Sequence, residues 1–482
     1  MTSTTDETRP GVEPLCVDMD GTLVQTDLLY EALFSLLKSS PSSLFALPAW
    51  LYGGKAALKH EIAARVEIDY TTLPYQQEFL EYLRNEKARG RELVLATAAN
   101  ATHANRVAEH LGLFDAVLAS GPDVNLSGSR KLEAIRAQCP GGFSYAGNTS
   151  ADVPIWEAAR EIVAVNPSLA ARGALHGFSR PIRTFTTEKR NGLRAFPTAI
   201  RLHQWVKNLL VFVPVITAHQ LLAHGTLATA ATAFVVFGLC TASVYLLNDL
   251  LDLREDRLHA TKRLRPIAAG LLSIQHAVFY LFALLVLAFV GAWLLLPAGF
   301  LLVLLIYYLL TVAYSLALKR LALVDIITLA ALYTLRIIAG GVATGIELSF
   351  WLLAFSMFLF TSLALAKRYT EIARLSGQQA LSAPGRGYRV GDLAALMHFG
   401  VASAQTSVLI LALYLNSEAV SALYTEPRWL WLLCPIVMYL TARIWLLAHR
   451  DELNDDPVLF VLRDRLSLLL GAAGLVLVWL GS

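Results

Sequence analysis

Long apolar runs follow one another from about residue 209 to the end of the chain, whereas the first 190 residues have the mixed composition of a soluble domain. Of the 482 residues, 56% are hydrophobic and only 16% are charged. Soluble proteins are about 45–50% apolar and about 25% charged, so part of this chain must lie in a membrane. We therefore predict a soluble N-terminal domain followed by an all-α, polytopic membrane domain.

The second half contains nine apolar runs that predict transmembrane helices. They fall at residues 209–224, 226–247, 274–296, 298–317, 322–341, 349–366, 393–415, 429–449 and 466–481. Several runs are shorter than the roughly 20 residues that cross a bilayer, so we expect their ends to extend into polar flanks. The pattern predicts about nine helices surrounded by a lipid bilayer.

Lys and Arg residues are distributed unevenly between the predicted loops. The opposite loops hold only Arg428, whereas the loops on one side hold basic clusters at 254–265, 319–320, 367–389 and 450–465. Basic loops face the cytoplasm, which fixes the orientation of the predicted helices. The polar N-terminus lacks the apolar core of a signal peptide, so we expect the soluble domain in the cytoplasm as well. We predict an integral protein of the bacterial inner membrane.

The stretch at residues 248–270 carries four acids and five bases directly after an apolar run. If the helix continues through it, Asp249, Asp252 and Asp256 lie on one face. Carboxylates at the end of a membrane helix are costly unless a cation lies against them, and Mg²⁺ suits a few carboxylates together with phosphate oxygens. The pattern predicts a magnesium–diphosphate site. A solvated helix end is the alternative, but it explains only the bases and leaves the three aligned acids unexplained.

Polar residues follow the predicted strands of the soluble domain. A strand at 15–17 ends in Asp18-Met-Asp20-Gly-Thr, and a second strand ends at Thr97. Lys131 opens a helix, and a later strand leads into Asn148-Thr-Ser-Ala-Asp152. Strands that alternate with helices predict a doubly wound parallel α/β sheet, in which ligands bind at the carboxyl ends of the strands.

These four motifs resemble those of the haloacid dehalogenase-type (HAD-like) phosphatases in order and spacing. The resemblance implies that Asp18 attacks phosphorus and that Asp20 acts as the acid and base. It also implies that Thr97 and Lys131 hold the phosphoryl oxygens, while Asp18, Asp152 and the Asp20 carbonyl bind Mg²⁺. A carboxylate attacks a phosphomonoester only when a metal ion and a lysine neutralise the oxygens that it approaches. The residue types therefore fit this chemistry.

The helical pattern at residues 28–87 resembles the small helical cap of that family. One departure concerns the fourth motif, which usually begins with an acid where this chain has Asn148. An amide adds no charge, so an inactive regulatory domain stays open as an alternative to an active phosphatase. We predict three parts: the phosphatase-like domain at 1–178, a basic linker at 179–200 and the membrane domain at 201–482.

The membrane half resembles the UbiA superfamily of intramembrane prenyltransferases over residues 195–482. The family motif NDxxDxxxD is matched at Asn248, Asp249, Asp252 and Asp256. The resemblance implies that Mg²⁺ binds a diphosphate at the cytoplasmic helix ends. The second Asp-rich motif of the family is absent, and KRYTE stands in its place at residues 367–371.

That departure, together with QWVKN, YSLALK and IAGGVATG, resembles the decaprenyl-phosphate phosphoribosyltransferase branch of the superfamily. In this branch the donor is 5-phosphoribosyl 1-diphosphate and the acceptor is a polyprenyl phosphate. Both substrates carry further phosphate groups, which need cations more than a second acidic motif. The candidate substrate-binding residues are Arg201, Lys207, Asn248, Arg257, Lys262, Arg265, Tyr314, Lys319, Arg336, Lys367, Arg368 and Glu371.

Two charged residues lie within the fifth predicted span, where Asp325 and Arg336 fall on nearly one face. Buried charges of this kind mark a site or pathway, or pair with neighbouring helices. Lys367 and Glu371 are i,i+4 neighbours at the end of the next span.

We predict a magnesium-dependent transferase that moves phosphoribosyl to polyprenyl phosphate, with the fused phosphatase removing the 5-phosphate. The alternative is a prenyltransferase that moves a polyprenyl group from its diphosphate to an aromatic or other polar acceptor, with an inactive or regulatory soluble domain. A transporter is disfavoured because of the three aligned acids. We expect no nucleic-acid partner, and the sequence is compatible with a homo-oligomer.

Overall fold

The computed structural model describes residues 13–186, 192–221, 223, 225–377, 387–417, 420, 424–453 and 456–481. The chain divides into two compact units, one of Met1–Ile200 with Leu246–Tyr280 and the other of Arg201–Tyr245 with Leu281–Ser482. The Asp-rich stretch that follows the first long apolar helix therefore belongs to the same unit as the soluble domain. The predicted division into three consecutive parts did not anticipate this.

The soluble domain is built on a sheet of six parallel strands in the order β3-β2-β1-β4-β5-β6. β1 lies at its centre and pairs with both β2 and β4. This arrangement confirms the predicted doubly wound parallel sheet. The strands are β1 (Leu15–Val17), β2 (Leu93–Asn100), β3 (Ala116–Ser120), β4 (Ser144–Gly147), β5 (Ile162–Val165) and β6 (Ile182–Phe185).

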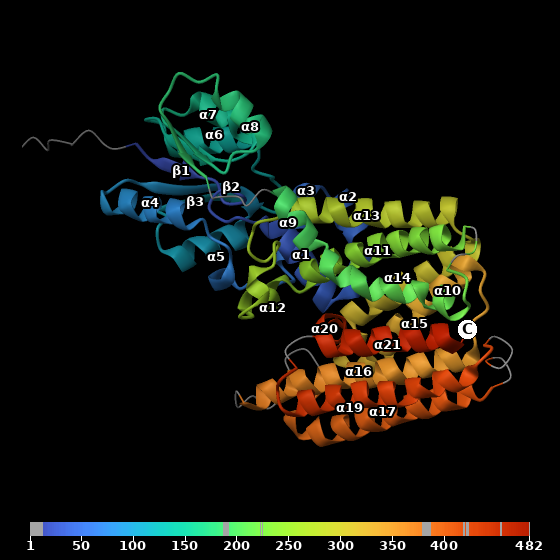
Figure 1. Cartoon of the computed structure of the whole chain (residues 1–482). Helices are drawn as coiled ribbons and strands as arrows, with labels where there is room; N and C mark the ends of the chain where they lie inside the picture. Colours follow the sequence, from blue (N-terminus) through green and yellow to red (C-terminus); the bar gives the residue numbers. More distant parts are fainter. Residues whose placement is uncertain are drawn as a thin grey trace, which may run out of the picture. The chain divides into compact units, whose positions relative to one another are not determined.

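Helices cover both faces of this sheet (Figure 1). Alternate strand residues point to opposite faces, so Leu15 and Val17 pack into one core and Cys16 into the other. The first core receives α4 (Gln77–Ala88) and α5 (Ala101–Leu111). The second receives α6 (Ser129–Gln138), α7 (Val153–Ala158) and α8 (Leu169–Leu175).

A helical insertion separates β1 from β2, as predicted. It contains α1 (Leu28–Ser39), α2 (Leu47–Tyr52) and α3 (Lys55–Ala63), with short 3₁₀ turns at Pro41–Phe45 and Tyr70–Thr72. Its helices enclose a small core of their own, formed by Ala32, Leu36, Ile62 and Val66. Asp27 caps the start of α1 by accepting hydrogen bonds from the backbone N–H groups of its first turn.

The predicted linker at 179–200 is only partly a connector. Ile182–Phe185 forms β6, the edge strand that pairs with β5, and Gly192–Ala199 forms α9. Residues 187–191 of the linker lie outside the described residues. The β6 side chains are largely exposed, which explains why this strand lacks the apolar pattern that revealed the others.

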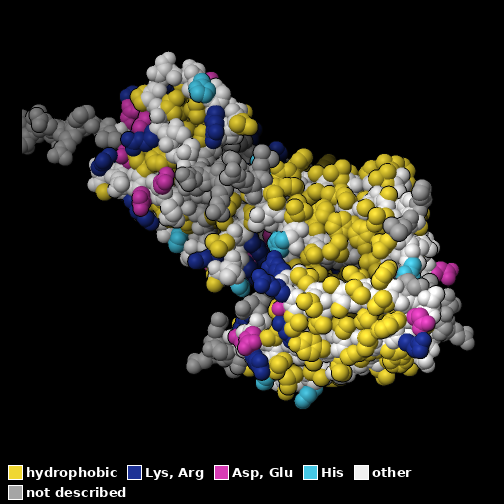
Figure 2. Space-filling view, in the orientation of Figure 1, with side chains coloured by type: hydrophobic (Ala, Val, Ile, Leu, Met, Phe, Trp, Pro, Cys, Tyr) yellow, Lys and Arg dark blue, Asp and Glu magenta, His cyan; other side chains and the backbone are white. Residues whose placement is uncertain are grey.

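Seven helices among the described residues are long and apolar enough to cross a membrane. Six of them are α11 (Thr226–Leu251), α13 (Ile274–Leu295), α14 (Ala298–Leu316), α15 (Val324–Thr344), α16 (Phe350–Gly377) and α17 (Leu393–Leu415). The seventh contains α19 (Leu433–His449), and the apolar helix α21 (Arg465–Gly481) is shorter. Apolar side chains cover most of the visible face of these helices (Figure 2).

The predicted count of nine spans is not confirmed, because the run at 209–224 does not form one membrane-length helix. A 3₁₀ helix at Leu202–Phe212 leads instead into the five-residue α10 (Val213–Thr217). Pro214 stands in the first turn of α10. Proline is tolerated there because its missing N–H needs no partner, whereas an uninterrupted helix from residue 209 would need that donor.

α15 is the central element of the second unit. Its Ile326 and Ile337 pack into one apolar cluster, and its Leu332 and Ala339 pack into another. Gly340 lies against the 3₁₀ segment so closely that a Cβ atom would fall 2.0 Å from the backbone oxygen of Val211. The smallest residue is therefore required at this position.

Candidate functional site

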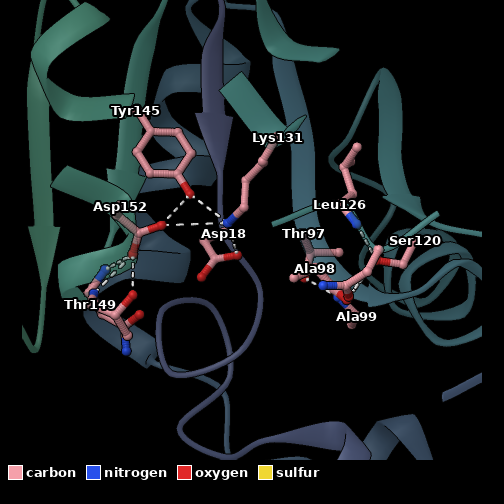
Figure 3. A network of polar contacts seen from close by, with 12 residues as sticks. Asp18, Thr97, Ala98, Ala99, Ser120, Leu126, Lys131, Tyr145, Thr149 and Asp152 are labelled. Carbon is pink, nitrogen blue, oxygen red and sulfur yellow. Dashed lines mark hydrogen bonds and ion pairs between the residues drawn. The ribbon is translucent and has the colours of Figure 1, made fainter. Parts of the chain in front are cut away.

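Asp18 lies directly after the central strand β1 and faces Lys131 of α6 (Figure 3). The Lys131 Nζ is 2.9 Å from Asp18 Oδ1 and 3.5 Å from Asp152 Oδ1. All three side chains are buried. The structure therefore brings together three residues that the sequence predicted for one phosphoryl-transfer site.

Asp152 is held by a dense set of donors. Its Oδ2 accepts hydrogen bonds from the backbone N–H groups of Asn148 and Thr149 and from the Thr149 hydroxyl. Its Oδ1 accepts a hydrogen bond of 2.8 Å from the Tyr145 hydroxyl. Burial raises the pKa of this carboxyl, but Lys131 and these donors bring it below its ordinary value. Asp152 is thus a fixed negative charge beside Lys131.

Asp20 lies in an environment that favours its protonated form. Burial, followed by the neighbouring carboxylates of Asp27 and Asp18, raises the pKa of Asp20 well above its ordinary value. Burial also raises the pKa of Asp18 to about 6, although Lys131 lowers it. A carboxyl acid next to a carboxylate nucleophile is the pairing that acid-assisted phosphate ester cleavage requires.

Asn148 contributes a buried oxygen to this site. Among the residues that the structure describes, the Asn148 Oδ1 has no hydrogen-bond partner. The amide lies so close to Gly21 that a Cβ there would fall 2.2 Å from Asn148 Nδ2, and Gly21 also has a positive φ of 76°. An oxygen acceptor without a donor beside a carboxylate suits Mg²⁺, which prefers oxygen ligands. Asp18, Asp152 and Asn148 therefore offer oxygens that fit a bound Mg²⁺.

A cavity of about 1050 Å³ opens onto these residues. Thr97 at the carboxyl end of β2 lines it, as the sequence predicted for a phosphate-holding residue. Lys59 of the helical insertion also lines it and donates hydrogen bonds to the Ala98 carbonyl and to Asn125 Oδ1. The cavity lining thus includes three lysines, Lys55, Lys59 and Lys131, which suits an anionic substrate.

The Asp-rich stretch contains a helix break that the sequence reading did not include. α11 ends at Leu251, and Asp252 precedes the short helix α12 (Leu253–Leu258). Asp249 and Asp256 are both buried, and one nitrogen of Arg265 lies 3.1 Å and 2.6 Å from their oxygens. The two carboxylates therefore face a common point that already holds a cation.

Asp252 makes a different set of contacts from the other two acids. The Lys38 Nζ of α1 lies 2.8 Å from Asp252 and 2.7 Å from Glu255. Among the described residues, no group of three or more His, Cys, Asp or Glu side chains converges as a metal site. Next to Asp249 in sequence, Asn248 adds a buried Oδ1 that has no hydrogen-bond partner within the described ranges. Two carboxylates and this oxygen still fit Mg²⁺, which typically takes only one or two protein carboxylates.

Arg257 was predicted to bind phosphate, but here it binds a carboxylate. Its two terminal nitrogens lie 2.8 Å and 2.6 Å from the two oxygens of Glu31 in α1. Both side chains are less than a tenth exposed. Such a bidentate, buried pair is specific in geometry. Arg257 therefore fastens the Asp-rich stretch to the helical insertion of the same unit.

In the second unit, two candidate phosphate ligands meet on one acid. The ammonium groups of Lys207 and Lys367 lie 2.8 Å and 2.9 Å from the same oxygen of Asp456. Asp456 also caps α20 (Pro457–Arg463). Two positive charges share one negative charge, so this cluster carries a net positive charge.

The remaining buried arginines of this unit are bound by protein groups. Arg368 is 1% exposed and pairs with Asp325 at 2.8 Å and with Glu371. Arg336 donates to Asn208 Oδ1 at 3.0 Å and to the Tyr307 hydroxyl at 2.9 Å. Asp325 and Arg336 therefore pair with neighbouring helices and not with each other.

The other candidate residues occupy varied positions. Arg201 has a positive φ of 50°, and its guanidinium lies 5.0 Å from the centre of the Tyr245 ring. Lys262 is exposed, whereas Tyr314 and Lys319 are half-buried near the end of α14. These positions leave their predicted roles as predictions.

Comparison with known proteins identifies both halves of the chain. The model of the UbiA prenyltransferase family matches residues 211–463. The chain belongs to the UbiA prenyltransferase family. The model of the haloacid dehalogenase-like hydrolases matches residues 15–157, so an N-terminal HAD-like domain is fused to the UbiA domain.

Three of the proteins that resemble this chain come from bacteria. The uncharacterized protein y4nM of Sinorhizobium fredii is 40% identical over 95% of this chain and 89% of its own length. The decaprenyl-phosphate phosphoribosyltransferase of Mycobacterium tuberculosis is 41% identical over 36% of this chain and 59% of its own length. The nodulation protein NoeC of Azorhizobium caulinodans is 34% identical over 58% of this chain and 91% of its own length.

Sequence reasoning missed several residues at both sites. Tyr145 appeared only as part of a buried strand, although a tyrosine hydroxyl in a strand core needs a partner. Lys59 stood in the helical insertion with no motif around it. Asp456 had a local signal, because an acid directly before a proline is typical of a helix start. Their partners are distant in sequence, so only the fold connects them.

Proposed function

We propose that the UbiA domain transfers 5-phosphoribosyl from phosphoribosyl diphosphate to a polyprenyl phosphate. The identity of 41% over 181 residues to a decaprenyl-phosphate phosphoribosyltransferase carries this proposal. In this reaction an oxygen of the lipid phosphate attacks the anomeric carbon of the ribose. The bond from that carbon to the diphosphate breaks, and diphosphate leaves.

The residues of the Asp-rich stretch suit the diphosphate end of this reaction. Asn248, Asp249 and Asp256 would hold Mg²⁺, which would neutralise charge on the leaving diphosphate. Arg265 already lies between the two carboxylates and can pair with a phosphate oxygen instead. In the second unit, a phosphate group could replace Asp456 as the partner of the Lys207 and Lys367 ammonium groups.

We further propose that the HAD-like domain removes the 5-phosphate from the lipid-linked product. Asp18 attacks phosphorus while Asp20 donates its proton to the departing ester oxygen. Water then cleaves the aspartyl phosphate, Asp20 takes a proton from that water, and inorganic phosphate is released. Lys131 neutralises the phosphoryl oxygens, and Mg²⁺ held by Asp18 and Asn148 would supply further positive charge. The soluble domain would act at the cytoplasmic face of the inner membrane, where phosphoribosyl diphosphate is available.

The mass of the lipid product tests both steps. Membranes containing the full chain receive phosphoribosyl diphosphate and polyprenyl phosphate. The molecular mass of the lipid is then measured by mass spectrometry. We expect lipid-linked ribose from the wild type, lipid-linked phosphoribose from Asp18→Asn, and unmodified lipid from Asp249→Asn. Retention of the 5-phosphate by both the wild type and Asp18→Asn would contradict the phosphatase step. Undiminished transfer by Asp249→Asn would contradict the assignment of the diphosphate site.

A second candidate function follows from the family itself, whose described activity is prenyl transfer. In that case polyprenyl diphosphate would be the donor, and the prenyl chain would move to an aromatic or other polar acceptor. A supply of both diphosphates to the same membranes distinguishes the two reactions, because only the true donor is consumed. Consumption of polyprenyl diphosphate alone would favour prenyl transfer.

A further inference from the structure

We propose that the HAD-like site acts on phosphate monoesters anchored in a membrane, and that the first two turns of α13 hold the apolar part of these substrates. The inference rests on the proposed phosphatase activity. Its basis is the cavity above Asp18, whose lining combines catalytic residues of the soluble domain with residues 270–276 and Tyr280 of the membrane half. All of these residues belong to the same compact unit.

The cavity is divided chemically. Its polar side consists of Asp18, Asp20, Lys131, Asn148 and Asp152, which suit a phosphate group. Its apolar lining comes from the helical insertion and from residues 270–280, which lead into α13, through Leu29, Leu58, Ile62, Leu271, Ile274 and Tyr280. A phosphate ester with a purely polar remainder would leave this apolar lining without a partner, whereas an amphiphilic ester would cover it.

Residues 270–280, which lead into α13, are fixed in place by contacts with the soluble domain. The Gln275 side chain donates a hydrogen bond of 3.0 Å to Asp27, the residue that caps α1. Gly270, at a φ of 71°, approaches Gln25 so closely that a Cβ would lie 3.1 Å from its Oε1. The buried Arg257–Glu31 pair fastens the same stretch further upstream. A wall held at three points is preformed and costs little ordering when a substrate binds.

Tyr280 is the largest side chain that this wall contributes. Its ring packs edge-on against Phe196 of α9, with the ring centres 4.8 Å apart, and lies 6.4 Å from the His276 ring. From here α13 continues to Leu295 as a membrane-length helix with exposed apolar side chains such as Phe282 and Trp293. The wall is therefore continuous in sequence with a membrane-length helix, which suits a substrate that carries a lipid tail.

A matched pair of substrates tests this inference on the full chain in detergent micelles. Methyl riboside 5-phosphate and dodecyl riboside 5-phosphate share the ester that is cleaved and differ only in the tail. We expect the wild type to hydrolyse both compounds. The KM for dodecyl riboside 5-phosphate should be at least about tenfold lower than that for methyl riboside 5-phosphate, because burial of roughly two methylene groups has this effect. Tyr280→Ala should lose most of this preference, through a higher KM for dodecyl riboside 5-phosphate.

Two further variants serve as controls. Tyr280→Phe keeps the ring and should keep the preference, and Phe282→Ala, which lies outside the cavity lining, should leave both KM values unchanged. Equal KM values for both esters in the wild type would overturn the inference alone. So would a preference that survives Tyr280→Ala, or an equal loss of rate on both esters. Hydrolysis of neither ester by the wild type would overturn the proposed phosphatase activity, and the inference with it.

Discussion

His103 is a buried histidine that lines the same cavity as Asp18, and its environment disfavours a charge on the imidazole ring. Its Nδ1 lies 2.9 Å from the Tyr70 hydroxyl, and burial lowers the pKa of His103 to about 4. In the unfolded chain the pKa is about 6.5, so between pH 6.5 and pH 4 the unfolded state binds more protons than the folded state. The contribution of neutral His103 to the free energy of unfolding is complete above pH 6.5 and is lost as the pH falls towards 4. We expect it to reach about 3 kcal/mol of unfolding free energy.

His103→Gln should therefore flatten the fall in Tm of the purified protein between pH 7.5 and pH 5. His110→Gln is the control, because His110 lies on the same helix α5 but is exposed. We expect this control to keep the wild-type pH profile. An equally steep fall in Tm for His103→Gln would show that other groups determine the acid sensitivity.

At the scale of single residues, motif spacing predicted which side chains of the soluble domain lie together. Asp18, Lys131 and Asp152 lie together as expected, because each follows or precedes a strand end on the same edge of a parallel sheet. By contrast, Arg368 and Arg257, which were predicted to bind phosphate, pair with Asp325 and Glu31, so their phosphate-binding roles stay predictions. An arginine fork suits a carboxylate as well as a phosphate, so residue type alone does not distinguish the two partners.

At the scale of elements, the long apolar runs predicted the helices and missed the interruptions. The break between α11 and α12 at Asp252 involves neither glycine nor proline, so no local signal marks it. The strand β6 was missed because an exposed edge strand needs no apolar alternation. Both features arise from contacts with distant parts of the chain, which override local preference.

Gly340 in α15 gives a testable case of element packing. Gly340→Ala would place a methyl group against the backbone oxygen of Val211, which cannot rotate away. We expect a loss of about 1–3 kcal/mol, as for other overpacked cores. Thermal unfolding of the purified protein measures it.

Gly471→Ala is the matched control within α21, where a Cβ meets no atom within 4 Å. We expect Gly471→Ala to be neutral or slightly stabilising, because alanine favours a helix more than glycine does. If Gly340→Ala were as stable as Gly471→Ala, the 3₁₀ segment would have moved to accommodate the methyl group without any loss of unfolding free energy.

At the scale of the whole molecule, Lys38 connects the soluble domain with the Asp-rich stretch of the same unit. Its ammonium lies 2.8 Å from Asp252, so it competes with any cation that this carboxylate would bind. Without this ammonium, Asp252 could join Asp249 and Asp256 in binding Mg²⁺. Lys38→Met should therefore lower the Mg²⁺ concentration for half-maximal transfer by about threefold, which corresponds to the modest strength of a partly exposed ion pair. Titration of transferase activity with Mg²⁺ measures this effect.

Lys87→Met is the control, since Lys87 pairs with Asp115 elsewhere in the soluble domain. We expect its Mg²⁺ requirement to equal that of the wild type. If Lys38→Met also titrates like the wild type, Asp252 takes no part in metal binding.

The assignment of residues 246–280 to the unit of the soluble domain has a consequence for how such a fusion can be rearranged. A cut after residue 200 would separate the HAD-like fold from part of its own cavity lining and from the partners of Glu31 and Lys38. The two halves of the chain are therefore not exchangeable at that point. In a chimera, recombination would preserve the HAD-like cavity only if the segment between α11 and α13 were inherited together with the N-terminal domain.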